Sequence, residues 1–188
     1  MAEPNNGVNL DALKQTDKML REDPGMAKMT LAAKASWDGG TRTTVTISDM
    51  RAGNGASVVP PTRRFTVTVD DPEALGGRDG APAGPEMVLA ALAGCVTAGI
   101  ATNAALFNVP IDQISIDFEA DMDGRGMFGH DKTVRNGITD IRYTVTIQSS
   151  APEEAVRRCK ETIDRKSPVR DTLANPVNVT SNFVYKPR

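Results

Sequence analysis

Histidine and cysteine are scarce in this sequence, which has one histidine and two cysteines among 188 residues. Neither cysteine belongs to a Cys-x-x-Cys pair, and His130 lies in a glycine-rich segment. Structural zinc sites gather four cysteine or histidine ligands at short spacings, which this chain does not offer. Residues 121–124 begin like a calcium loop, but the twelfth position is Lys132 where such a loop needs a glutamate. We therefore expect no metal and no other bound cofactor.

A surplus of charge of either sign is also missing. The formal net charge is −2, and aromatic residues make up 4% of the chain. Surfaces that bind nucleic acid or anionic membranes need basic stripes, and none is present. The first residues lack the basic start and apolar core of a secretory signal, and no uninterrupted run of 18 apolar residues occurs. We expect a cytoplasmic protein that binds neither nucleic acid nor a membrane.

The predicted elements indicate an α+β fold with a largely antiparallel sheet, because the strands cluster instead of alternating with helices. Periodicity predicts helices at 8–20, 85 to about 107 and 153–163, and strands at 31–37, 42–48, 65–69, 114–118, 141–147 and 177–185. Residues 1–27 form a predicted N-terminal helical arm, and residues 28–188 form one predicted domain. A chain of this length can bury a real core.

Cys95 and Cys159 both fall on the apolar side of a predicted helix, 64 positions apart. Around the first, Val88, Leu92, Cys95 and Gly99 recur at spacings of three and four, which is one helix face. Either cysteine alone is most simply a small buried packing residue. In the cytosol, however, paired thiols more often carry out redox chemistry or bind metal than form a static disulfide. The two together suggest a pair that meets in the fold.

The chain resembles the OsmC/Ohr superfamily over residues 31–185. The resemblance is carried by LGGRDG at 75–80, PEMVLAALAGC at 85–95, Cys159, SPV at 167–169 and NPV at 175–177. WDGGTR at 37–42 and DGRGMFG at 123–129 are similar to an OsmC-like branch whose members carry an N-terminal helix. The resemblance implies antiparallel sheets wrapped around a long central helix, in an intertwined homodimer with two active sites at the subunit interface.

The same resemblance implies a thiol-dependent peroxidase that reduces organic hydroperoxides in oxidative stress defence. Cys95 would attack the peroxide O–O bond as a thiolate and become a sulfenic acid. Cys159 would act as the resolving thiol and form a disulfide with it. An external thiol or a lipoyl-type dithiol would then reduce that disulfide. We interpret Ser167 as a packing residue near the second cysteine.

An arginine and a glutamate are expected to steer the first thiol. A cysteine thiol has a pKa near 8.5, which burial raises, so a reactive one needs a nearby cation. Arg42 is the first candidate and Arg78 the second. Glu86 is the candidate carboxylate, but it precedes Cys95 by nine positions where the family's glutamate precedes by ten. One position turns a helical side chain by about 100°, and Glu86 can instead stabilise the helix N-terminus as a first-turn acid.

Two functions from different classes remain open on the sequence. The first is the organic hydroperoxide peroxidase. The second is a stress-response protein that binds a lipid or another small molecule and has little or no peroxidase turnover. The two retained cysteines favour the first, and the displaced Glu86 favours the second.

Overall fold

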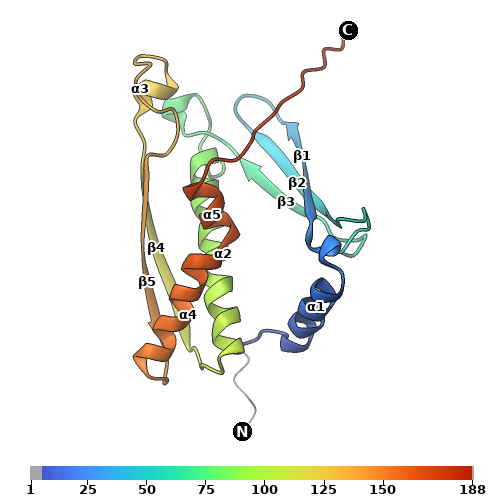
Figure 1. Cartoon of the computed structure of the whole chain (residues 1–188). Coiled ribbons are helices and arrows are strands. Elements are labelled where there is room, and N and C mark those ends of the chain that lie inside the picture. Colours follow the sequence, from blue (N-terminus) through green and yellow to red (C-terminus); the bar gives the residue numbers. More distant parts are fainter. Residues whose placement is uncertain (1–5, 188) are drawn as a thin grey trace.

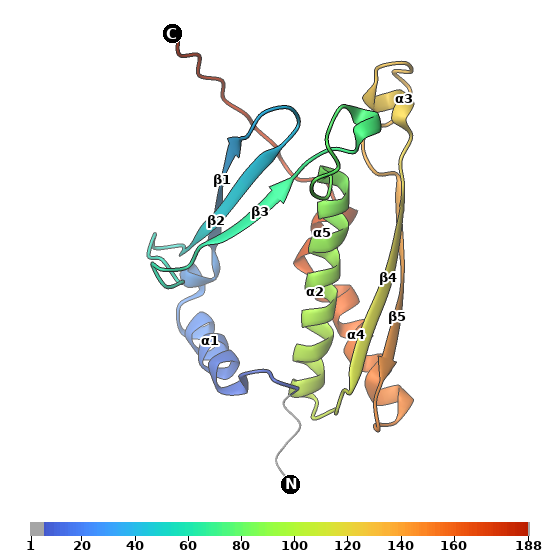
Figure 2. The ribbon, with the colours of Figure 1, turned by 180° about the vertical axis from the view of Figure 1, so that it is seen from behind.

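The computed structural model describes residues 6–187 and divides the chain into two halves (Figures 1 and 2). The sheet half comprises α1 (Leu10–Glu22), a 3₁₀ turn (Pro24–Ala27), β1 (Met29–Trp37), β2 (Thr43–Ala52) and β3 (Phe65–Val69). The helix half comprises α2 (Gly84–Leu106), β4 (Gln113–Asp121), α3 (Gly124–Met127), β5 (Asp140–Gln148), α4 (Glu153–Lys166) and α5 (Pro168–Ala174). A loop with a second 3₁₀ turn (Glu73–Leu75) joins them. All strand pairs are antiparallel, which confirms the α+β prediction.

The strands predicted at 31–37 and 42–48 are present and pair with each other as a hairpin. β1 and β2 pair from Met29–Ala52 to Trp37–Thr43, and β3 pairs with the other edge of β2. Gly39 and Gly40 form the turn with φ of 95° and 59°, a region that glycine adopts without steric cost. The Trp37 indole N–H donates to the carbonyl of Gly40 at 2.9 Å. The turn therefore fixes the position of the next residues, which include Arg42.

The helix half holds nearly all of the buried apolar core. Leu92, Val96, Ile100 and Ala104 recur every four residues along one face of α2 and are buried there. This face packs against α4 and against the inner row of the β4–β5 sheet, where Ile116 pairs with Val145. The alternating apolar pattern predicted for both strands is confirmed by alternating burial.

The opposite face of α2 is uncovered in the single chain. A helix that is apolar almost all round is typically buried, yet Ala91, Gly94 and Ala98 lie on this face and are exposed. By length and composition alone, α2 is also long and apolar enough to cross a membrane. The sequence, which has no uninterrupted apolar run of that length, did not indicate this. An apolar helix with one open face needs a further covering layer.

The C-terminal segment differs most from the sequence prediction. After α5, residues 175–187 extend away from the body and form no strand, so the predicted last strand at 177–185 is wrong for the single chain (Figure 1). Val179 and Phe183 are 86% and 89% exposed. Their alternating pattern suits a strand, but a strand forms only where an edge offers hydrogen-bond partners. We call residues 175–187 the tail.

The total exposed surface is far larger than the size of the chain requires. It amounts to 13828 Å² for 20.1 kDa, whereas a compact monomer of that mass exposes about 8,700 Å². Much of the surplus is apolar, since Leu31 and Trp37 in the sheet half are 70% and 76% exposed. The extra exposed surface therefore includes large apolar side chains of the kind that a compact monomer buries.

Candidate active site

Cys95 lies in the middle of α2 and is partly buried. Its Sγ is 3.1 Å from Oγ of Ser167, the residue between α4 and α5. The two residues are 72 positions apart in the chain, so this contact is made by the packing of α2 against the junction of α4 and α5. The structure thus gives the predicted peroxidatic thiol a hydroxyl partner.

Ser167 is held in place by both helices that it joins. It ends α4, where its backbone N–H donates to the carbonyl of Ile163 at 2.8 Å. It also begins α5, where its Oγ accepts the backbone N–H of Arg170 at 3.2 Å. The residue is only 2% exposed. Its hydroxyl therefore has a fixed position, with the O–H proton still available to a second partner.

The packing of α2 on α4 fixes which residues face each other. Cys95 lies opposite Ser167, and one turn further along α2 a Cβ at Gly99 would overlap the side chain of Ile163. The helices therefore run antiparallel, as Figure 1 also shows. Continuing by another turn brings Cys159 to the level of Asn103. Cys159 precedes Ser167 by eight residues, or about 12 Å of helix rise.

The structure does not bring Cys95 and Cys159 together. A disulfide needs Cα atoms within about 7 Å, and both cysteines are free thiols. Cys159 is fully buried in the core, where its Sγ–H donates to the carbonyl of Ala155 at 3.2 Å. Burial raises the pKa of the Cys159 thiol. In the single chain Cys159 thus lies in the apolar core, and the hydrogen-bond partner of Cys95 is Ser167 instead.

Glu86 is engaged at the N-terminus of its own helix. Its Oε2 accepts the backbone N–H of Ala83 at 2.7 Å. This is one half of a capping box, because Ala83 has no side-chain acceptor to complete the other half. The geometry matches the helix-stabilising alternative for Glu86, and its carboxylate forms no ion pair with Arg42 or Arg78 within residues 6–187.

Arg42 and Arg78 belong to the junction between the two halves. The guanidinium of Arg42 lies beside Gly80, where an added Cβ would be 2.8 Å from Nη1. The centre of this junction is Asp70, which is buried and accepts hydrogen bonds from Thr41 Oγ1 at 2.6 Å and from the backbone. The Thr41 bond holds the pKa of Asp70 below its usual range, with backbone donors including Arg78 adding to the effect. In the described chain neither arginine contacts Cys95.

A cavity of about 870 Å³ opens beside the Cys95–Ser167 contact. Val88 and Leu92 line it from α2, and Leu92 is one helical turn before Cys95. Arg170, which donates its backbone N–H to Ser167, lines it from α5 together with Leu173. The remaining walls come from β5, from α4 and from the loop around α3. The cavity is large enough for an organic molecule of moderate size.

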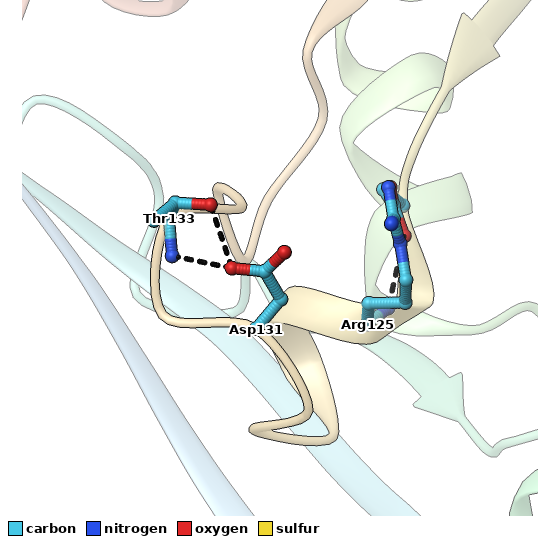
Figure 3. Close-up of polar contacts among 4 residues, drawn as sticks. Arg125, Asp131 and Thr133 are labelled. Atoms are coloured by element: carbon cyan, nitrogen blue, oxygen red, sulfur yellow. Dashed lines mark hydrogen bonds and ion pairs between the residues drawn. The ribbon is translucent and has the colours of Figure 1, made fainter.

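The loop around α3 is tied together by its own carboxylates. Asp131 accepts the backbone N–H and the hydroxyl of Thr133 at 2.9 and 2.6 Å (Figure 3). Asp123 accepts from the guanidinium of Arg125, which lowers the pKa of Asp123 to about 2. These carboxylates are used in stabilising the loop that carries Met127 to the cavity wall.

Sequence reasoning missed Ser167 as a functional residue. The spacing could have pointed to it, because Cys159, Ile163 and Ser167 follow one another every four residues. Residues at this spacing lie on one face of a helix. The spacing identifies the face but does not say which of the three meets Cys95.

Comparisons with known proteins agree with this architecture. The family described as OsmC-like protein matches residues 77–182. Among solved structures, an OsmC-like protein from Mycoplasma pneumoniae is 17% identical, with 78% of this chain and 87% of that one covered at a TM-score of 0.54. A Psychrobacter arcticus protein named for an osmotic stress and detoxification response is 14% identical, with 74% and 85% covered at 0.53. An OsmC-like protein of unknown function from Vibrio cholerae is 9% identical, with 76% and 92% covered at 0.52.

At these identities the solved structures support the fold. A search of curated proteins finds no match. The family match spans more than half of the chain, including α2 with Cys95 and the α4–α5 junction with Ser167. The protein belongs to the OsmC-like family.

Proposed function

We propose that this protein is a thiol-dependent peroxidase that reduces organic hydroperoxides, with Cys95 as the reacting thiol. The observation that carries the proposal is the position of Cys95. The residue is partly exposed, its Sγ is 3.1 Å from the buried hydroxyl of Ser167, and it lies one helical turn from a cavity lined in part by apolar side chains. Reactive cysteines are found where a thiolate has a hydrogen-bond partner and access to solvent. Cys159, by contrast, is fully buried from solvent, and this burial raises the pKa of its thiol.

The proposed reaction begins with a two-electron oxidation of Cys95. The thiolate attacks the distal oxygen of the hydroperoxide, the O–O bond breaks, and the alkoxide leaves and takes up a proton. The products are an alcohol and a Cys95 sulfenic acid. Two external thiols then restore the enzyme: the first forms a mixed disulfide and releases water, and the second regenerates Cys95 and leaves as a disulfide. Such reductants are abundant in the cytoplasm, where we also propose that the protein acts.

The cavity supports an organic substrate over hydrogen peroxide. Val88, Leu92 and Leu173 offer apolar surface and Arg170 supplies positive charge at the same cavity, where Lys160 is paired with Asp164. An alkyl or fatty-acyl group can be desolvated against the apolar side chains, whereas hydrogen peroxide makes no such contact. Burial of apolar surface stabilises a bound ligand by about 25 cal/mol per Å².

We also propose that the working protein is a homodimer. The sheet half, the exposed face of α2 and the tail all present apolar surface. The total solvent-exposed area of the chain exceeds that of a compact monomer of the same mass by about 5,000 Å². Obligate homodimer interfaces bury roughly 2,000–5,000 Å² or more. In this arrangement a second copy supplies the cation that Cys95 needs, with Arg42 as the first candidate. Sedimentation without detergent tests the assembly: a monomer, or a chain that stays soluble only in detergent, contradicts it.

Peroxide consumption is the direct test of the function. We expect reduced protein with a dithiol to consume cumene hydroperoxide with a higher kcat/KM than hydrogen peroxide, and Cys95→Ser to abolish both reactions. Cys159→Ala serves as the matched thiol control and is expected to keep the activity. Equal rates for wild type and Cys95→Ser contradict the proposal.

Ligand binding without turnover is the second candidate, and the cavity favours it. An 870 Å³ space whose lining combines apolar side chains with polar ones, including Arg170, suits an amphipathic anion such as a fatty acid. Binding of a fluorescent fatty acid, measured with wild type and with Val88→Trp, tests this function. Tight binding that Val88→Trp removes, together with no peroxide consumption, would replace the peroxidase proposal with this one.

A further inference from the structure

The hydroxyl of Ser167 occupies the place in which a resolving thiol would have to lie. Cys95 Sγ and Ser167 Oγ are 3.1 Å apart, and both atoms are held by helices that pack on each other. The second thiol of the chain, Cys159, lies two helical turns away on α4, about 12 Å along the axis. Ile163 fills the turn between them and packs against Gly99.

The hydrogen bonds of Ser167 determine the direction of this contact. A serine hydroxyl has one proton to donate and two lone pairs to accept with. One lone pair accepts the N–H of Arg170, so the O–H proton remains for Cys95. A thiolate has no proton and can only accept. Ser167 therefore donates to Cys95 whenever the sulfur is a thiolate, and this hydrogen bond fixes the position of the sulfur.

We infer that Ser167 is the positioning residue for the Cys95 thiolate, and that the protein works with a single redox-active cysteine whose sulfenic acid is reduced by an exogenous thiol. The inference rests on the proposed peroxidase function for its second half. Resolution transfers two electrons from external thiols: Cys95–SOH and one thiol give a mixed disulfide and water, and a second thiol displaces Cys95 from that disulfide. Cys159 takes no part in either step.

The burial of Cys159 supports this division of roles. Its side chain is fully buried among apolar residues that include Ile100 and Ala104. To reach Cys95 it would have to leave that core and α4 would have to slide by two turns. Such a shift would break the contact of Ile163 with Gly99 and leave a cavity in the apolar core of the helix half.

The first test uses geometry alone and does not depend on peroxidase activity. Reduced wild type, Cys159→Ala, Ser167→Cys and the Ser167→Cys/Cys159→Ala double variant are treated with diamide, and peptide mass spectrometry locates the disulfides. We expect an intramolecular disulfide between Cys95 and the introduced thiol in both Ser167→Cys proteins, and none in wild type. A Cys95–Cys159 disulfide in wild type overturns the inference.

The second test measures the effect of the hydroxyl on Cys95. The rate of Cys95 alkylation by iodoacetamide at a fixed neutral pH is compared in wild type, Ser167→Ala and Ser167→Thr. We expect slower alkylation in Ser167→Ala, because the hydroxyl that donates to the Cys95 sulfur is gone. Ser167→Thr keeps a hydroxyl and is expected to restore the rate. Equal rates in all three proteins overturn the positioning role.

The third test separates this inference from the proposed function. One equivalent of cumene hydroperoxide is added to reduced wild type in the presence of dimedone, which traps sulfenic acids. We expect dimedone on Cys95 and a free thiol at Cys159, while Ser167→Cys gives a disulfide and no trapped product. If Cys95 reacts with the peroxide no faster than free glutathione, the peroxidase function fails. The contact and the independence of Cys159 are still decided by the diamide and alkylation results.

Discussion

The helix half and the sheet half of this protein are stabilised in different ways. The helix half buries a continuous core between α2, α4 and the β4–β5 sheet. The sheet half has extensive backbone pairing but little burial, since α1 has no buried residue and Leu31, Trp37 and Phe65 are exposed. Backbone pairing alone does not stabilise a three-stranded sheet in water. The helix half therefore has a buried apolar core of its own, whereas the apolar face of the sheet half has no covering layer within the described chain.

The largest expected effect comes from removing the tail. Deleting all residues after Ala174 removes apolar side chains such as Val179 and Phe183, which have no covering surface within the chain. We expect a shift from dimer to monomer or aggregate, measured by sedimentation velocity. Lys186→Gln is the control in the same segment. A truncated protein that stays dimeric would show that the tail is not part of the interface.

Loss of core volume in the helix half is expected to have the next largest effect. Ile100 is fully buried, and Ile100→Ala should destabilise the fold by about 2–5 kcal/mol in chemical denaturation. Leu31→Ala in the sheet half is the matched comparison. It should cost little in a monomer, but its effect should depend on protein concentration if a second copy covers Leu31. Equal, concentration-independent losses would remove the distinction between the halves.

A smaller effect is expected at the contact between α2 and α4. In Gly99→Ala the new methyl group overlaps Ile163, and overpacking of this kind costs about 1–3 kcal/mol. The same displacement should separate Cys95 from Ser167, so peroxide consumption should fall together with stability. Gly94→Ala is the control, because a Cβ there meets nothing in the chain. Loss of dimer in Gly94→Ala alone would place Gly94 in the subunit interface.

The smallest expected effect is the pH dependence contributed by Cys159. Burial raises its pKa in the folded state above that of the unfolded thiol, which is about 8.5. Above that pH the unfolded state loses a proton that the folded state keeps, so stability falls as pH rises. One proton sets an upper limit of about 1.4 kcal/mol per pH unit. Denaturation at pH 7 to 10 should show this slope in wild type and a weaker one in Cys159→Ala.

Much of the local structure could be predicted from the sequence. The Gly39–Gly40 turn, the alternation in β4 and β5 and the continuous apolar helix around Cys95 each follow from short-range rules, and each is present. Glu86 shows where such rules leave a choice. Its place in the first turn allowed either a steering or a capping role, and the bond to Ala83 N–H supplies the second.

Two features depended on contacts between distant segments. The tail has the pattern of a strand, but in the described chain it pairs with neither sheet. The second feature that depended on such contacts is the hydrogen-bond partner of Cys95. Helix periodicity places Cys159, Ile163 and Ser167 on one face, yet all three satisfy the same period of four.

The sequence by itself therefore determined the faces: which side chains point inward, and that Cys95 lies on the core helix of an α+β fold. The tertiary structure alone decided the axial register of α4 against α2, which places Ser167 beside Cys95 and Cys159 two turns away. The physical reason is that amphipathic periodicity is unchanged when a helix slides by one turn. Only the close fit of Ile163 against Gly99 selects one register among several with the same hydrophobic pattern.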